Sequence, residues 1–432
     1  MKAGFAKAPI TPPPGTAMLG FWSRDKQGGC RGVHDDIHAR AAYIEHDGEP
    51  VLIMGFDLCF VGREEADRFK GAIGSKLDLS PRQILLNASH SHVGPAVPSA
   101  AFADYLPPDR LYVRELEAAT VSAACAARDA AREVSIWAGA TRSALPMNRR
   151  KAGEDGRVSM RPNPEGVVCD HLPVCLLKDA DGEPVCLLFS VSCHPSTISG
   201  FEISADYPGP AMDALDAHLG GACSLFLQGC GGDAKPSVIG AGESRWRRAS
   251  WDDVADAGRM VAHEVVAALD AGLDRCEPRV ATRLIEMQWP LAEAATREDC
   301  EAVLADPEAE DLRHLWARQM VTLMDRGWQP PSAAPIICHG VKLADGVRLV
   351  ALEGEAVAEF GLQMLGFYDD GVTFPLGYSN GTGLYLVTTP MLAEGGYEAE
   401  SYFEYGLPAP LAGGQEGILD AALKELAAGG ID

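Results

Sequence analysis

Two histidines, His90 and His92, stand two positions apart where a short apolar segment ends. The branched residues at 84–86 indicate the end of a buried strand, and the Asn, Ser, Gly and Pro that follow indicate a loop. If the backbone is still extended there, both imidazoles project from one face, because side chains on a strand repeat every second residue. Neutral imidazoles at a sheet end are suitable transition-metal ligands. The alternative is one histidine bonded to backbone in the core and one exposed to solvent.

Two further strand-like segments end at residues that could join such a site. The apolar segment 185–192 is followed by His194, and the apolar segment 347–352 is followed by Glu353 and Glu355. Two histidines and a carboxylate are a common catalytic zinc set that leaves a coordination position for water. Strand ends gather at one edge of an α/β sheet, so convergence is expected. Glu353 competes with Glu355 for the ligand role, and Glu355 could instead be a carboxylate at a helix N-terminus.

Strands and helices that could position these residues are indicated along most of the chain. Hairpins are expected over 38–56, with an Asp47-Gly48 turn, and over 171–192. Helices are expected at 63–77, 109–133, 250–273, 356–367 and 414–428. Residues 147–151 are expected to form a polar loop. Without repeats or low-complexity linkers, residues 1–432 are predicted to form one compact α/β catalytic domain with mixed β-sheets flanked by helices.

Composition narrows the class of protein. The chain has 432 residues, 47% of them hydrophobic, and a formal net charge of −24, which argues against nucleic acid or an anionic membrane as partner. No apolar run approaches the roughly 18 residues of a membrane span, and the N-terminus lacks the apolar run of a signal peptide. The twelve cysteines include no Cys-x-x-Cys and are expected to be reduced core thiols. A cytoplasmic protein is therefore predicted.

Short motifs from residue 10 to residue 398 resemble, in order, those of the catalytic domain of the neutral (alkaline, non-lysosomal) ceramidase family. The motifs are Ile10-Thr11-Pro12-Pro13, Gly32-Val33-His34-Asp35, Ser89-His90-Ser91-His92-Val93-Gly94-Pro95, Asn148-Arg149, His194-Pro195, Ser204-Ala205-Asp206-Tyr207-Pro208-Gly209, Gly232-Asp233, Gly354-Glu355, Tyr385-Leu386-Val387-Thr388-Thr389 and Tyr397-Glu398. Each match alone is weak, but their order along nearly the whole chain supports a divergent member of this family.

The resemblance implies an amide hydrolase with one zinc ion per chain. In the family the substrate is an N-acylsphingosine. The implied ligands are His90, His194, Glu355 and Tyr385. Tyrosinate is an unusual ligand that the spacing alone does not suggest, and Tyr385 could instead be a core aromatic residue with a satisfied hydroxyl.

Two departures from the family pattern argue against ceramide itself. Family members with ceramidase activity carry a nucleophilic serine two residues after Gly-Asp, whereas this chain has Lys235 there, after Gly232-Asp233. The large C-terminal β-sandwich domain of the family is also expected to be absent. Lys235 cannot form an acyl-serine, but it could bind a carboxylate, phosphate or hydroxyl of a substrate, or be a solvated loop lysine. A small polar substrate is therefore expected.

The predicted mechanism is zinc-assisted hydrolysis of an N-acyl bond. Zinc lowers the pKa of water to about 7 and polarises the scissile carbonyl. The resemblance implies that His92, Arg149 and Tyr397 line the reaction centre. His92 would pass a proton to the leaving amine. Arg149 and Tyr397 would donate to the developing oxyanion, an effect of about 3–4 kcal/mol per donor, or else be a loop cation and a surface aromatic residue.

Two more hypotheses concern residues around this centre. Asp206 is expected to orient His194 from outside the ligand set, or to cap the helix that it precedes. Arg245, Arg247 and Arg248 are expected to form a mobile gate for an anionic substrate.

Other functions remain open on the sequence alone. One is a deacetylase or deacylase of amino sugars or other small acyl compounds. Another is a degenerate family member that binds a metal or ligand without turnover. The sequence does not indicate the oligomeric state.

Overall fold

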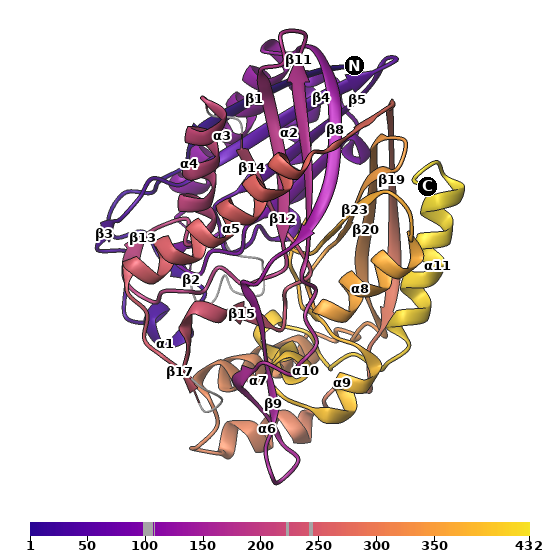
Figure 1. Cartoon of the computed structure of the whole chain (residues 1–432). Coiled ribbons are helices and arrows are strands. Elements are labelled where there is room, and N and C mark those ends of the chain that lie inside the picture. The colour runs from indigo at the N-terminus through magenta and orange to yellow at the C-terminus, as the bar shows by residue number, and fades with distance from the viewer. Residues whose placement is uncertain (98–106, 108, 222–223, 242–244) are drawn as a thin grey trace.

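The computed structural model describes residues 1–97, 107, 109–221, 224–241 and 245–432. Its largest sheet has nine strands in the order β14-β12-β11-β8-β1-β4-β5-β6, with β18 paired to β8. Figure 1 shows β1, β4, β5, β8 and β11 of this sheet running side by side. The strands are β1 (Lys2–Pro9), β4 (His38–His46), β5 (Glu49–Phe56), β6 (Ile84–Ala88), β8 (Arg132–Arg142), β11 (His171–Asp179), β12 (Pro184–Val191), β14 (Ser224–Gln228) and β18 (Asp274–Cys276). The pairs β5–β6 and β12–β14 are parallel, and the other neighbours are antiparallel.

A second, four-stranded sheet packs against the first. Its strands are β19 (Pro278–Pro290), β20 (Ala333–Ala344), β21 (Val347–Leu352) and β23 (Val372–Leu376). One buried cluster joins Ile44, Leu85 and Leu188 of the large sheet to Val341 and Leu349 of the small one. Burial of apolar area contributes roughly 25 cal/mol per Å², so this interface holds the two sheets together as a rigid base for the loops at their ends.

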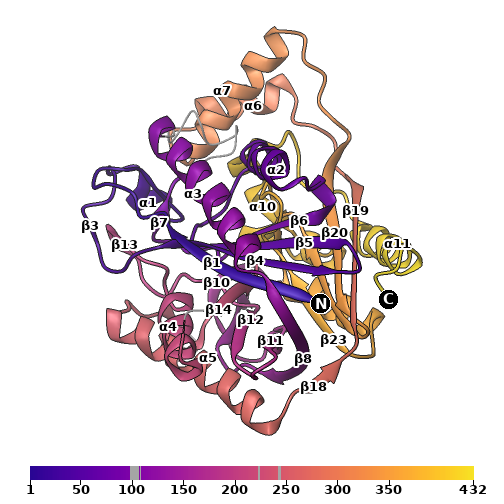
Figure 2. The ribbon, with the colours of Figure 1, turned by 90° about the horizontal axis from the view of Figure 1, so that it is seen from above.

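Helices cover the outer faces of both sheets. They are α2 (Arg63–Leu77), α3 (Arg110–Asp129), α4 (Pro208–Leu219), α5 (Trp251–Ala271), α8 (Ala358–Phe367) and α11 (Gln415–Ala428). Helices α2 and α3 pack on β4 and β5, and α4 and α5 pack on β11, β12 and β14. Helices α8 and α11 cover the second sheet. The pair α6 (Arg297–Ala305) and α7 (Asp311–Asp325) lies at the periphery, as Figure 2 shows.

Most of the predicted framework is confirmed, including the mixed α/β class, the two hairpins and the helices α2, α5, α8 and α11. The helix expected over 109–133 ends at Asp129, and residues 132 and 133 of the expected range are instead the first residues of β8. The expected polar loop at 147–151 is wrong, since these residues lie in β9 (Pro146–Ala152), which pairs with β10 (Val158–Asn163) and β15 (Ala234–Pro236). Arg149 and Arg150 in β9 are buried because the carboxylate of Glu398, which lies far along the chain, neutralises them.

The two edge strands of the large sheet, β6 and β14, come together at their C-terminal ends. Asn87 in β6 accepts a hydrogen bond from the backbone nitrogen of Gln228 in β14, at 2.8 Å. The Asn87 amide also donates to the carbonyl of Gly377, beyond β23, at 2.9 Å. One buried side chain therefore ties the ends of three strands, and the loops that follow them meet.

Within the described residues, no helix is both long and apolar enough to cross a membrane. The cysteines in the same ranges carry free thiols, as the sequence predicts, and most are buried.

Candidate metal centre and its cavity

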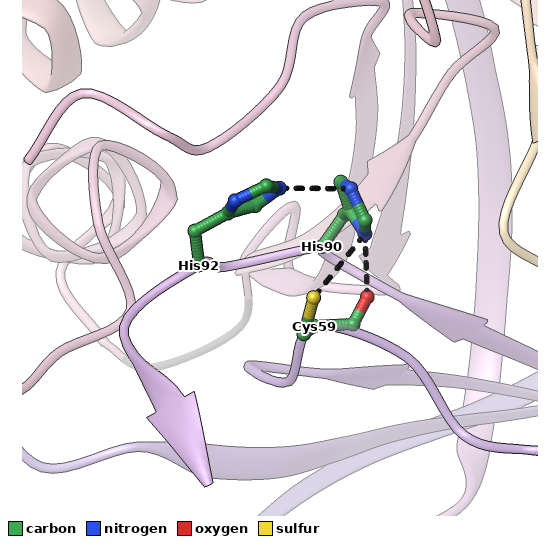
Figure 3. A group of neighbouring side chains, drawn as sticks. All are labelled: Cys59, His90 and His92. Carbon is green, nitrogen blue, oxygen red and sulfur yellow. Dashed lines mark hydrogen bonds between the residues drawn. The ribbon is translucent and has the colours of Figure 1, made fainter. Parts of the chain in front are cut away.

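His90 enters the centre from a turn and not from a strand. Strand β6 ends at Ala88, and His90 has a left-handed backbone with φ of 69°. The expectation of an extended backbone there is therefore wrong, although the rings of His90 and His92 still meet, with 4.6 Å between their centroids. Figure 3 shows that Nδ1 of His90 donates to the carbonyl of Cys59, at 2.7 Å. This bond places a proton on Nδ1 and turns Nε2 toward the centre.

His194 is held in the same way at the end of β12. Its Nδ1 donates to the carbonyl of Gly231 at 2.7 Å, so its Nε2 presents a lone pair. The backbone nitrogen of His194 donates to the carbonyl of Ala234 at 3.1 Å, which fixes the loop against β15. The side chain is fully buried. Burial, followed by the charges of Arg149 and His90, lowers the pKa of His194 to about 3.

Glu355 brings a carboxylate to these two nitrogens. Its Oε2 lies 3.1 Å from Nε2 of His90 and 3.4 Å from Nε2 of His194. Ligand atoms about 2.0–2.1 Å from a tetrahedral zinc ion stand about 3.3 Å apart. Oε2 is buried, and both imidazole nitrogens face it. Nitrogen and oxygen atoms thus converge on one point, which is the arrangement that a cation requires.

The electrostatics of the centre favour positive charge. Burial lowers the pKa of His90, but the Glu355 carboxylate and Cys59 outweigh it and raise this pKa to about 10. Burial likewise raises the pKa of Glu355, yet His90 and His194 hold it well below its usual range. A buried carboxylate that stays ionised needs a proton on a neighbour or a metal ion.

Tyr385 completes the ligand set that the resemblance implies. Strand β22 (Glu355–Ala356) pairs with β24 (Tyr385–Leu386), and Glu355 is directly opposite Tyr385 in this parallel register. The phenol oxygen lies 3.3 Å from Nε2 of His194 and accepts a hydrogen bond from Nη2 of Arg149 at 2.9 Å. Burial raises the pKa of Tyr385 well above its usual range, and Arg149 is the group that acts to lower it. The phenol of Tyr385 therefore lies beside the His194 imidazole at this centre.

Arg149 is buried beside this tyrosine because a carboxylate neutralises it. Its Nε donates to Oε1 of Glu398 at 2.8 Å, and Arg150 donates to the other oxygen of Glu398 at 2.8 Å. The guanidinium therefore points at the phenol of Tyr385 from a fixed position. This geometry places Arg149 next to a ligand, whereas the sequence hypothesis has it donate to an oxyanion.

A cavity of about 630 Å³ opens above these residues. His92, Lys235 and Tyr397 line it together with the ligands. The Nε2 atoms of His92 and His90 are 3.0 Å apart, so they share a proton or face a cation together. Tyr397 is 40% exposed and donates to Glu404 at 3.1 Å, which makes it a cavity wall residue with one face in solvent.

The geometry also shows what two other candidate carboxylates, Asp206 and Glu353, contact. Asp206 does not contact the His194 ring, which uses Gly231. Its oxygens accept hydrogen bonds from the backbone nitrogens of Thr197 and Ile198, in the loop after His194, and of Tyr207. Glu353 faces away from the centre and pairs with Arg63. Glu355 is therefore the carboxylate that reaches the histidines.

The three arginines of the expected gate lie outside the described cavity wall in this structure. Arg245, Arg247 and Arg248 do not belong to the described residues that line the cavity. Arg247 donates to Asp253 near the start of α5 at 2.8 Å and to the carbonyl of Val238. Its role in the structure is to anchor the segment before α5.

Sequence reasoning missed three residues that hold Glu355, Arg149 and His90 in place. The phenol of Tyr405 donates to Oε1 of Glu355, and no motif marks this tyrosine. Glu398 neutralises Arg149, and its place in the Tyr397-Glu398 motif is a signal that could have identified it. Cys59 supplies the carbonyl that fixes the His90 ring, a contact through backbone that side-chain patterns do not reveal.

Two known ceramidase structures have a fold similar to that of this chain. The structure of neutral ceramidase from Pseudomonas aeruginosa aligns with a TM-score of 0.72 and 17% identity, over 98% of this chain and 73% of that chain. A ceramidase complexed with C2 aligns with a TM-score of 0.74 and 16% identity, over 98% and 74%. No family model and no curated protein matches the sequence. The chain therefore has the neutral ceramidase fold, as the motifs indicate, and its sequence is far from these two.

Proposed function

We propose that this protein is a zinc-dependent hydrolase of N-acyl amide bonds that acts on a small polar substrate and not on ceramide. One observation carries the proposal: Oε2 of buried Glu355 lies 3.1 and 3.4 Å from the Nε2 atoms of two imidazoles that are each fixed through Nδ1. The fold shared with ceramidases supports the reaction class.

The residues present fit a metal ion. Two imidazole nitrogens and a carboxylate oxygen lie within 4.8 Å of one another, and Tyr385 adds a phenol oxygen. Nitrogen and oxygen donors of this kind suit zinc. When bound, zinc supplies a Lewis acid for the scissile carbonyl and acidifies water at its open coordination position.

The other residues are proposed to handle protons and hold the substrate. His92 lines the cavity beside the ligands, and its Nδ1 is buried without a partner in the described part of the chain. It is positioned to pass a proton to the leaving amine nitrogen. Arg149 holds Tyr385 and keeps its oxygen polarised. Tyr397 covers the Tyr385 ring, with 5.6 Å between the centroids, and limits the entry of water.

The size and lining of the cavity support the substrate class. Its volume of about 630 Å³ is typical of a small-molecule site. Lys235 stands where family members with ceramidase activity carry their serine, so an acyl-serine route through this position is excluded. Hydrolysis by water is the mechanism that remains.

Metal content and turnover test the proposal together. Purified protein should contain one zinc ion per chain and should hydrolyse at least one member of a panel of N-acetylated amino acids, N-acetylated amino sugars and short-chain ceramide. A chelator should abolish turnover, and added zinc should restore it. His90→Ala should lose both metal and activity, whereas exposed His218→Ala should keep both. Metal-loaded protein that is inert on every acyl compound would favour a binding function.

A further inference from the structure

We propose that Lys235 and Ser196 form a binding site for a substrate carboxylate, so that the preferred substrates are N-acyl amino acids or similar N-acyl compounds with an acid group close to the amide. This inference deepens the proposed function and rests on it. It names the substrate class that the same cavity selects.

The first argument is a comparison of the cations that line the cavity. Lys26 pairs with Asp311 at 2.9 Å, and Arg149 pairs with Glu398 at 2.8 Å. Lys235 has no carboxylate within ion-pair distance among the described residues, although it lines the same cavity. Burying a charge without a partner is costly. An unpaired ammonium in a cavity wall is therefore available to an anionic ligand.

The second argument is an independent polar group in the same wall. Ser196 is 3% exposed, and its Oγ has no hydrogen-bond partner within the described ranges. Ser196 follows His194 in a loop that bonds to β15, the strand that carries Lys235. A buried hydroxyl without a partner is rare unless a ligand or water satisfies it. Because both residues line this cavity, the inference assigns the hydroxyl of Ser196 and the charge of Lys235 to one ligand group.

Lys235 is also held in place. Strand β15 pairs with β9, where Lys235 is opposite Met147, next to Asn148 and Arg149. Its Nζ lies over the ring of Trp246, 5.6 Å from the centroid. A cation–π contact restrains an ammonium but leaves its charge in place. The charge is therefore fixed in direction before any ligand arrives.

The position of the Lys235 ammonium limits where on the substrate the carboxylate can be. Lys235 and Ser196 line the same cavity as His92 and the residues of the metal centre. A carboxylate bound there lies near the bond that is cleaved. An N-acyl amino acid has its carboxylate on the carbon next to the amide nitrogen and meets this requirement. Apolar residues Leu19, Phe21 and Phe60 line the cavity and suit the acyl group.

Calorimetric titration with N-octanoylglycine and its uncharged amide, N-octanoylglycinamide, tests this site. Zinc-loaded and metal-free protein are both used, because a carboxylate could bind the metal directly. We expect the wild type to bind the acid at least tenfold more tightly than the amide in both forms. Lys235→Met should reduce this preference at least tenfold, and Lys235→Arg should retain most of it. Lys26→Met, which removes the paired lysine of the same cavity, should keep the preference.

Four outcomes separate this inference from the proposed function. Equal affinity for acid and amide overturns the inference, and so does a preference that Lys235→Met leaves intact. Binding of the acid through Lys235 without hydrolysis supports the carboxylate site and contradicts the hydrolase. Hydrolysis of the amide in preference to the acid supports the hydrolase and contradicts the carboxylate site.

Discussion

The phenol of Tyr405 donates a hydrogen bond to Oε1 of Glu355, and this bond turns the other oxygen, Oε2, toward His90 and His194. The two residues are fifty positions apart, and both are buried. A carboxylate that binds a metal with one oxygen usually has its second oxygen held by a donor. Tyr405 therefore sets the orientation of the Glu355 carboxylate toward the two histidines.

Removing this hydroxyl should weaken metal binding. We expect Tyr405→Phe to reduce zinc affinity by about 10–100-fold, because the Glu355 carboxylate loses the partner that fixes its rotation. Competition with a chromophoric chelator measures the affinity. Half-buried Tyr402→Phe is the matched control and should leave the affinity unchanged. An unchanged affinity in Tyr405→Phe would show that Glu355 is held by other contacts.

The two neighbouring glutamates should separate metal binding from stability. Glu355→Gln should lose zinc, because an amide is a poor ligand in place of a carboxylate, and should keep the fold. Glu353→Gln should keep zinc but lower the free energy of unfolding by about 1–3 kcal/mol, since Glu353 accepts bonds from Arg63 and the backbone of Ile337. The lower end applies because the Arg63 side chain is 30% exposed.

Urea unfolding and metal content measure these two effects. If Glu353→Gln loses the metal and Glu355→Gln retains it, the assignment of the ligand is reversed.

The sequence predicts the elements of this fold better than it predicts their contacts. Hydrophobic periodicity located the hairpins and most helices because it reports local burial on one face. Charge was a poor guide at 147–151. The basic residues there suggested a solvent-exposed loop, but Arg149 and Arg150 are buried because both donate hydrogen bonds to Glu398. Sequence reasoning also failed for the route of His90 into the site, since the left-handed backbone there depends on contacts with the segment after β5.

Ligand convergence could be expected from strand ends, but not demonstrated by spacing. His90, His194 and Glu355 follow strands of two different sheets, and only packing of those sheets decides the distances between them. Tyr385 came from the resemblance alone, and Tyr405 from neither source. Such residues act through pairing across long sequence separations, which a local pattern does not encode.

The arginines before α5 should affect stability and not substrate binding. Arg247→Ala removes an exposed ion pair with Asp253, and we expect a loss of about 0.2–1 kcal/mol in the free energy of unfolding. KM for any substrate found should be unchanged, because Arg247 does not line the described cavity. Arg259→Ala, which removes another exposed pair on α5, is the control for stability. A KM that rises in Arg247→Ala alone would restore the gate hypothesis.

The affinity for the acid ligand should fall in alkaline solution. Burial, followed by the charge of Arg149, lowers the pKa of Lys235 to about 8, while Asp206 and Cys193 act in the opposite direction. Below that pH the ammonium is protonated and binds the carboxylate. Above it the charge is lost, and affinity should fall by up to about tenfold per pH unit.

Titration of metal-free protein with N-octanoylglycine between about pH 6.5 and 9.5 measures this dependence without a contribution from a metal. Lys235→Arg should bind the acid with a flat profile, because a guanidinium stays charged throughout this range. N-octanoylglycinamide should give a flat profile with both proteins. If the wild type and Lys235→Arg lose affinity for the acid in parallel, the titrating group is not Lys235, and the carboxylate must bind elsewhere in the cavity.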